Sequence, residues 1–425
     1  MLSYARAFQG FDRDVRLYFG VVTLLGVSVF GGITVVLLNL YLLRLGYGPE
    51  IVGVVNAASQ IALAAFSLPA AMLGRRFGSR RMLLLALGLL ALGNAGLALV
   101  EAFREPLRFI WLLFTPAVAS FGLALLLVND KPFVMGVTRV EERNHVYSLL
   151  GALSPLAGAV GGLVGGILPM LFALSLGVGL EAASPYRYPL LISASLVVVA
   201  FAVMTRTRGP AGGADGRDVV ASGRAPVGLV WAMSLVVFAQ VAGEVAARTF
   251  LNVYLDRGLG VTSEIIGPIF ALAQLVGVAA ALSMPFFARR LGIARTFVVG
   301  TVGLVIAVVP LALVANVWAA GLGYVGIVAF ASIARPCIIV YQLEVVKQEW
   351  RGLMAAGTTV AYGASAGLVA LAGGYVIAGT GYSTLFLACG LVSLVGAALF
   401  WAYFRTPRGE YAAGHLEGAE TAPLH

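Results

Sequence analysis

Four polar side chains recur at every fourth residue inside a long apolar run between Val227 and Leu255. They are Gln240, Glu244, Arg248 and Asn252. Steps of four place side chains on one side of an α-helix, so the four are predicted to form one polar stripe. An ionisable group inside an apolar span costs ~2.5–3.5 kcal/mol on insertion scales, and it usually faces a cavity or a partner. The chemistry open to this stripe is ion pairing, ligand binding or proton exchange.

Glu244 lies near the middle of that run and is the candidate coupling group. Burial disfavours the ionised form of its carboxyl group, whereas Arg248 favours it. Glu before Arg at a spacing of four residues is also the favourable order for an ion pair on a helix. Two interpretations stay open, a proton-exchanging coupling site and a structural ion pair with Arg248.

Two further cations stand directly before a proline inside apolar runs, Lys131 before Pro132 and Arg335 before Pro336. A proline frees a backbone carbonyl and bends the helix, which suits the wall of a cavity that moves. Asp130 precedes Lys131, and this pair is either part of the same cavity or a group that reaches for water near the helix end.

The elements that must position these groups are apolar helices. Of the 425 residues, 60% are hydrophobic and 11% are charged, far from the average soluble domain. Each apolar run approaches or exceeds the ~20 residues that cross a bilayer as a helix, and the runs do not alternate as strands would. The twelve predicted spans are Leu17 to Leu43, Ile51 to Leu73, Met82 to Val100, Ile110 to Val137, Val146 to Leu174, Tyr188 to Met204, Val227 to Leu255, Ile265 to Phe287, Thr296 to Val314, Trp318 to Val345, Leu353 to Ile377 and Leu385 to Phe404.

The net charge of +9 is a topology signal. With a cytoplasmic N-terminus, 20 of the 28 Lys and Arg residues fall in inner segments and 5 in outer segments. This bias places both termini in the cytoplasm of a multi-pass inner-membrane protein, with anionic-lipid contact as a side effect. Arginine greatly outnumbers lysine, which is typical of a GC-rich bacterial source. No basic stripe with interleaved aromatics appears, so nucleic-acid binding is not expected.

The sequence shows no motif of an enzyme or of a metal-binding or cofactor-binding protein. The three histidines are scattered, so we expect no metal, and no cofactor or enzyme motif stands out. Cys337 and Cys389 lie in apolar runs and are predicted to be buried thiols.

A repeat of half the chain length runs through the sequence. Asn39 and Tyr41 return as Asn252 and Tyr254, an offset of 213 (252 − 39), and Glu50 returns as Glu264, an offset of 214 (264 − 50). Duplication inside a hydrophobic chain indicates two similar bundles. Asn39 and Tyr41 are therefore candidate cavity or gate residues, or merely interhelical hydrogen-bonding groups. The predicted parts are 1–206, an N-terminal six-helix bundle; 207–226, a Gly-rich cytoplasmic linker; 227–405, a C-terminal six-helix bundle; and 406–425, a cytoplasmic tail.

The segment after the second span resembles the loop motif of the major facilitator superfamily, Gly-x-x-x-Asp-Arg-x-Gly-Arg-Arg. Ala71 to Arg80 matches it at three positions, and a second copy stands between the eighth and ninth spans, where that family repeats it. Arg75 replaces the family's acidic residue, so the cytoplasmic lock that the resemblance implies is weaker or differently built here. The predicted cytoplasmic gate residues are Arg75, Arg76, Gly78, Arg80, Arg81, Arg289, Arg290, Gly292 and Arg295.

The resemblance implies an all-α membrane protein of twelve transmembrane helices in two pseudo-symmetric bundles, with a substrate cavity between them and alternating access. Ser154-Pro155, with glycines at 151, 158, 161, 162, 165 and 166, resembles the family's exporter motif in helix five. We therefore expect a monomeric secondary transporter, with proton-coupled export of a small, amphipathic or anionic molecule. The alternatives are an importer or facilitator of an organic anion and, in another class, a lipid scramblase or a non-transporting receptor.

Overall fold

The chain is helical throughout the part that the structure describes. The computed structural model describes residues 11–139, 142–209, 225–406 and 409, and no strand occurs among them. Twelve helical stretches in this part are long and apolar enough to cross a membrane. The helices from the first half of the chain are α2 (Arg13–Ser28), α3 (Ile33–Arg44), α4 (Pro49–Phe77), α5 (Ser79–Ala98), α6 (Leu107–Val137), α7 (Arg143–Leu176) and α8 (Ser184–Thr205). Those from the second half are α9 (Val227–Gln240), α10 (Ala242–Val253), the π-helix η3 (Tyr254–Gly258), α11 (Ser263–Leu291), α12 (Ile293–Leu313), α13 (Val317–Glu344), α14 (Arg351–Thr380) and α15 (Tyr382–Phe404), with short 3₁₀ turns at Val100–Ala102 and Gln348–Trp350.

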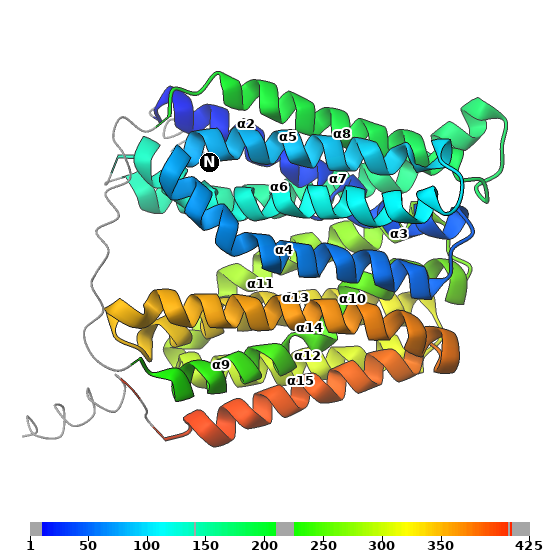
Figure 1. The fold of residues 1–425 in the computed structure, drawn as a ribbon. Helices are drawn as coiled ribbons and strands as arrows, with labels where there is room; N and C mark the ends of the chain where they lie inside the picture. Colours follow the sequence, from blue (N-terminus) through cyan, green and yellow to red (C-terminus); the bar gives the residue numbers. More distant parts are fainter. Residues whose placement is uncertain (1–10, 140–141, 210–224, 407–408, 410–425) are drawn as a thin grey trace, which may run out of the picture. The chain divides into compact units, whose positions relative to one another are not determined.

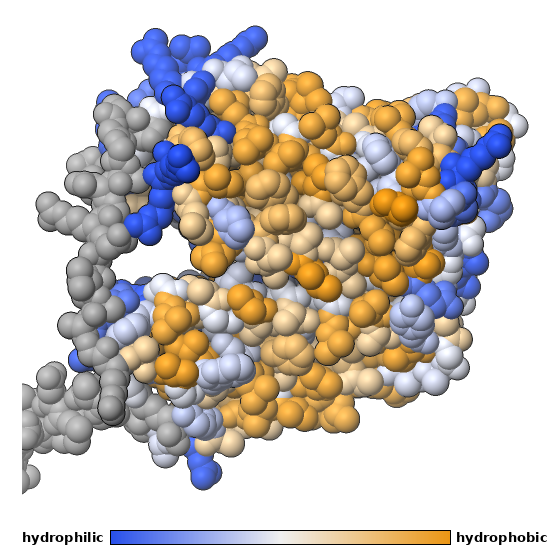
Figure 2. Space-filling view, viewed as in Figure 1, coloured by the Kyte–Doolittle hydropathy of each residue, from blue (hydrophilic) through white to orange (hydrophobic). Residues whose placement is uncertain are grey.

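These segments form helices because the bilayer core offers no water, so the backbone N–H and C=O groups must hydrogen-bond to each other. Their apolar side chains point outward as well as inward; Leu68, for example, is 71% exposed. Hydrophobic side chains cover the middle of the helices on the face seen in Figure 2, and hydrophilic ones gather at the helix ends. The predicted fold class, an all-α protein with twelve transmembrane helices, is confirmed.

Contacts divide the chain into two compact units. Unit 1 comprises Met1–Gly216 and Asn252–Leu275, and unit 2 comprises Arg217–Leu251 and Val276–His425. The segment Asn252–Leu275 belongs to the second repeat by sequence, yet it packs with the first. The predicted linker and tail fall largely on 210–224, 407–408 and 410–425, which lie outside the described residues.

Each unit has its own hydrophobic core. In unit 1, α2, α5, α6 and α8 lie side by side (Figure 1), and the rings of Tyr18 and Phe133 pack 5.2 Å apart. In unit 2, Phe400 packs edge-on against Phe297 at 4.6 Å and against Tyr341 at 5.1 Å. Such offset and edge-to-face pairs hold α12, α13 and α15 together.

The first span of each half is broken, whereas the sequence predicted continuous runs. α2 ends at Ser28 and α3 begins at Ile33; α9 ends at Gln240 and α10 begins at Ala242. Gly31 has φ +82°, a conformation that glycine adopts cheaply, and a Cβ at Gly32 would overlap the carbonyl of Val27. The hydropathy of these runs conceals the breaks because the residues at the breaks, 29–32 and Val241, carry no charge.

The two copies of the loop motif each contain the expected tight turn at a glycine. Gly78 between α4 and α5 has φ +84°, and Gly292 between α11 and α12 has φ +81°. Arg80 donates to the carbonyl oxygens of Thr205 and Thr207, at 2.8 Å each, and so satisfies backbone groups at the end of α8.

Candidate functional site

Glu244 is the centre of a buried ion-pair cluster in unit 2. Its Oε1 accepts a hydrogen bond from Nε of Arg248 at 2.8 Å and from a terminal nitrogen of Arg335 at 2.7 Å. Arg248 follows Glu244 by one turn of α10, and Arg335 comes from α13, at the residue before Pro336. We call Glu244, Arg248 and Arg335 the Glu244 cluster.

The cluster carries a net positive charge, and its two guanidinium groups are partly exposed. Glu244 is 2% exposed, while the side chains of Arg248 and Arg335 are 37% and 45% exposed. One carboxylate against two guanidinium groups leaves a formal charge of +1. Each guanidinium has five N–H donors, and the carboxylate uses only part of them, so donors remain for an anion.

Aromatic rings border the cluster. The guanidinium of Arg335 lies 5.6 Å from the ring centroid of Tyr362 in α14, within cation–π range. Tyr324, earlier in α13, is 2% exposed. A planar guanidinium stacked on a ring is held in one orientation, which favours directed binding over a mobile charge.

The helix break leaves Gln240 of the predicted polar stripe at the end of α9, while Glu244, Arg248 and Asn252 lie together on α10. Gln240 ends α9, is 3% exposed, and its backbone nitrogen stands 2.6 Å from the place that a Cβ on Gly396 would take. Asn252 instead lies in unit 1, where its amide donates to the carbonyl oxygens of Val35 and Val36. Of the four, Glu244 and Arg248 bond to each other through their side chains.

The repeat mates Asn39 and Asn252 meet in unit 1. The amide of Asn39 donates to Asn252 Oδ1 at 3.2 Å, and Asn56 donates to Asn39 Oδ1 at 2.9 Å. Tyr41 donates its hydroxyl to Glu101 at 2.9 Å. These contacts all lie within unit 1.

Asp130 and Lys131 lie in unit 1 near the end of α6. Asp130 accepts from the backbone nitrogen of Lys131 at 2.6 Å, and the Lys131 side chain is exposed. Tyr147 of α7 donates to the Lys131 carbonyl at 3.3 Å. The Glu244 cluster belongs to unit 2.

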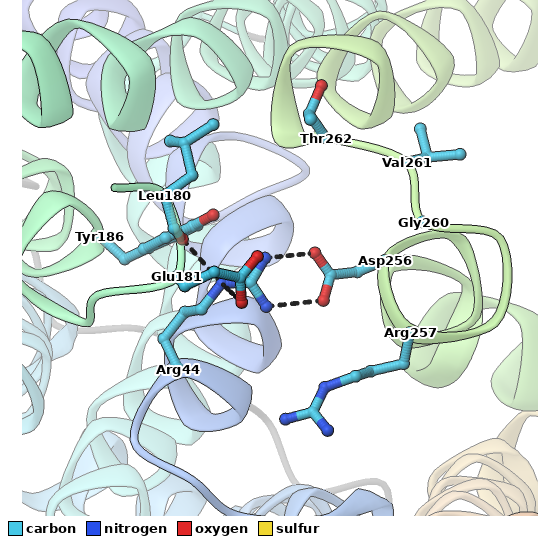
Figure 3. A pocket seen from close by; sticks show the side chains of 9 residues that line it. All are labelled: Arg44, Leu180, Glu181, Tyr186, Asp256, Arg257, Gly260, Val261 and Thr262. Carbon is cyan, nitrogen blue, oxygen red and sulfur yellow. Dashed lines mark hydrogen bonds and ion pairs between the residues drawn. The ribbon is translucent and has the colours of Figure 1, made fainter. Parts of the chain in front are cut away.

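An ion pair that the sequence reasoning missed joins Arg44, the last residue of α3, to Asp256. Two parallel hydrogen bonds of 2.7 and 2.6 Å link the guanidinium to both carboxylate oxygens. Arg44 also donates Nε to the Leu180 carbonyl at 2.8 Å, and Glu181 lies 3.8 Å away. We call this set the Arg44 clamp. It borders a cavity of about 190 Å³ (Figure 3) with the lining residues Arg44, Leu180, Glu181, Tyr186, Asp256, Arg257, Gly260, Val261 and Thr262.

A one-residue insertion accompanies the π-helix that contains Asp256. The repeat offset grows from 213 to 214 after Arg257. Leu45 donates to the carbonyl of Tyr41, four residues earlier, whereas Leu259 donates to that of Tyr254, five residues earlier. The extra residue thus forms the π-turn η3, as single insertions into helices often do. The change in offset was the sequence signal for this π-turn.

Outside the spans, Tyr47 donates its hydroxyl to Glu105 at 2.5 Å. Partial burial, together with this bond and the nearby Glu105 carboxylate, raises the pKa of Tyr47 to about 12.

The predicted gate arginines mostly face outward. Arg75, Arg76, Arg81, Arg289, Arg290 and Arg295 are exposed, and Arg80 is half-buried. Arg290 stacks over Phe286 at 4.3 Å and Arg76 over Phe77 at 5.3 Å. No group of three or more His, Cys, Asp or Glu residues that could hold a metal ion occurs in the described part of the chain.

Twelve spans, two of which share a charged cluster, are those of a multi-pass membrane protein. A family model described as Major Facilitator Superfamily matches residues 19–356, and the chain belongs to that superfamily. No curated protein sequence matches the chain significantly.

Solved transporters share the fold. A D-xylose–proton symporter is similar with a TM-score of 0.72 and 14% identity, over 92% of this chain and 96% of that one. The nucleoside transporter NupG gives 0.67 and 14%, over 92% and 100%. A bacterial homologue of the human lysosomal transporter Spinster, in an inward-facing and occupied conformation, gives 0.67 and 14%, over 92% and 95%. At this identity the likeness shows the fold alone, and these proteins differ in their named substrates.

Proposed function

We propose that this transporter moves a small organic anion and that the Glu244 cluster binds it. The observation that carries the proposal is the Oε1 atom of Glu244, which accepts from Arg248 and Arg335 while both guanidinium groups keep exposed donors. Charge-assisted bonds from arginine are the strongest and most directional that a carboxylate, sulfonate or phosphate can receive. The flanking ring of Tyr362 suits a substrate with an apolar part.

Proton coupling follows from competition within the cluster. The Glu244 carboxylate and an anionic substrate compete for hydrogen bonds from the guanidinium groups of Arg248 and Arg335. A proton on Glu244 removes its charge and releases donors, so a proton and an anion bind together more favourably than either alone. Glu244 is thus proposed as the coupling residue, and Arg335 and Arg248 as the substrate-binding residues.

The direction of net transport then depends on which gradient drives the cycle. The helix-five motif favours export, as the sequence predicted. Co-binding of a proton and an anion favours symport, which an inward proton gradient drives toward uptake. The proposed setting remains the inner membrane with both termini cytoplasmic, and the proposed form is a monomer.

Alternating access requires contacts that form in one state and break in another. The Arg44 clamp and the Asn39–Asn252 bond tie residues 252–275 to helices of the first repeat within unit 1. We propose that these contacts open during the cycle.

The test is proton movement in proteoliposomes with a trapped pH-sensitive dye. A panel of organic carboxylates, sulfonates and phosphate esters is added outside, with a neutral sugar and an organic cation as controls. The proposal expects alkalinisation outside, and acidification within, on addition of at least one anion, and a weaker signal with Arg335→Gln. If only the neutral sugar or only the organic cation changes the internal pH, and no anion does, the substrate is not an anion. Everted vesicles from cells settle the direction, and lipid movement without any gradient dependence would favour the scramblase alternative.

A further inference from the structure

A serine from the last span of each half contacts the broken first span of the same half. In unit 1, Oγ of Ser193 in α8 lies 2.7 Å from Oγ of Ser28 and 2.7 Å from Oγ1 of Thr34, on either side of the α2–α3 break. In unit 2, the backbone nitrogen of Gly243 donates to Oγ of Ser393 in α15 at 2.9 Å. Ser193 and Ser393 are both fully buried. Each unit therefore has a buried serine against its first span, but Ser193 bonds side-chain hydroxyls and Ser393 accepts from a backbone N–H.

Ser393 supplies an acceptor that the broken helix lacks. The first N–H groups of a helix have no partner within it, and a preceding side chain often caps them. Here the cap comes from another helix. A Cβ on Gly243 would stand 3.1 Å from Ser393 Oγ and 3.2 Å from Leu304 Cδ2, so the close approach depends on glycine. The first turn of α10 is thereby fixed against α15.

The residue after Gly243 is Glu244. Its bond to Arg248 lies within α10 and moves with that helix. Its bond to Arg335 joins α10 to α13, so this bond depends on where α10 begins. A cap that fixes the first turn of α10 therefore affects the bond between Glu244 and Arg335. It leaves the bond between Glu244 and Arg248 unaffected.

We propose that Ser393 is a positioning residue that holds Glu244 against Arg335 and so sets how far Arg335 is available to an anion. This inference rests on the proposed function of the cluster, but its test needs no substrate. The Arg335 and Arg248 side chains are both partly exposed, so phenylglyoxal, which reacts with free guanidinium groups, reports on each separately.

The experiment follows the rate of phenylglyoxal modification at Arg335 and Arg248 by peptide mass spectrometry, on the full-length protein in detergent. Ser393→Ala is expected to speed modification of Arg335 roughly fivefold, the factor that the loss of one ordinary hydrogen bond allows, and to leave Arg248 unchanged. Ser393→Thr keeps the hydroxyl and should restore the slow rate. The matched control is Ser193→Ala, which removes the corresponding serine in unit 1 and should leave both rates unchanged.

Gly243→Ala is a second variant, which keeps the Ser393 hydroxyl but pushes it away from the backbone nitrogen of residue 243. It should also speed phenylglyoxal modification of Arg335 and leave that of Arg248 unchanged. Equal rates at Arg335 in the wild type and both variants would overturn the proposal. A rise at Arg335 and Arg248 together would also overturn it, because general loosening of unit 2 and not a shift of Glu244 would be the cause. If transport of every tested anion fails while Arg335 responds as expected, the positioning role stands and the proposed function falls.

Discussion

The guanidinium of Arg44 and the carboxylate of Asp256 form two parallel hydrogen bonds in unit 1, with only 8% and 6% of the two side chains exposed. Removing one member of a buried ion pair leaves the other uncompensated, which typically costs ~3–5 kcal/mol. Asp256→Asn should therefore lower the thermal unfolding temperature in detergent clearly.

The control for the Arg44 clamp is Arg257→Gln in the next position, because Arg257 donates to a backbone carbonyl, that of Leu43, at 3.1 Å. Arg257→Gln should lower the unfolding temperature less than Asp256→Asn does. The double exchange Arg44→Asp with Asp256→Arg should recover part of the stability. Equal unfolding temperatures for the Asp256 and Arg257 variants would show that the clamp contributes no special stability.

Arg335→Gln should weaken anion binding to the Glu244 cluster. A hydrogen bond to a charged group contributes ~1.5–3 kcal/mol, so we expect the apparent affinity to fall by roughly 10- to 100-fold. The measurement is the concentration dependence of anion-driven proton movement in proteoliposomes. Arg335→Lys keeps the charge but loses the planar fork, and an intermediate affinity is expected. Unchanged affinity in the Gln variant would remove Arg335 from the site.

Glu244→Gln should uncouple transport from the proton gradient, since the amide keeps the size of the side chain and cannot exchange the proton. Anion uptake by proteoliposomes is compared with and without an imposed pH difference, and the variant should give the same rate in both. Glu344→Gln is the control, because Glu344 is exposed at the end of α13. If the Glu244 variant still follows the pH difference, another group carries the proton.

Gly166→Ala should destabilise the contact between α7 and α11. A Cβ at Gly166 would lie 2.7 Å from the carbonyl oxygen of Ser263 and 2.9 Å from Cα of Gly267, so backbone must shift. Overpacking of this kind costs ~1–3 kcal/mol. Gly151→Ala, on the same helix with no atom within 4 Å of the new Cβ, is the matched control and should unfold at the wild-type temperature. Equal unfolding temperatures for both variants would contradict this close approach.

Several features follow from the sequence because they depend on short-range rules. Continuous apolar runs predict spans, and positive φ is cheap only for glycine, which marks the turns at Gly78 and Gly292. The pair of Glu244 and Arg248 follows from the helical period alone, since residues four apart share a face. The breaks in the first spans did not follow, because uncharged residues such as Gly31, Gly32 and Val241 in an apolar run also suit an unbroken helix.

Tertiary structure alone decided which groups from distant spans meet. Arg335 joins Glu244 across 91 residues, Asp256 joins Arg44 across 212, and Ser393 joins Gly243 across 150. Such pairs depend on the rotation and axial position of one helix against another, and these are set by the packing of many side chains at once. A period within one helix carries no information about them. The sequence thus determined which residues are unusual in a membrane span, and the packing of the helices determined their partners.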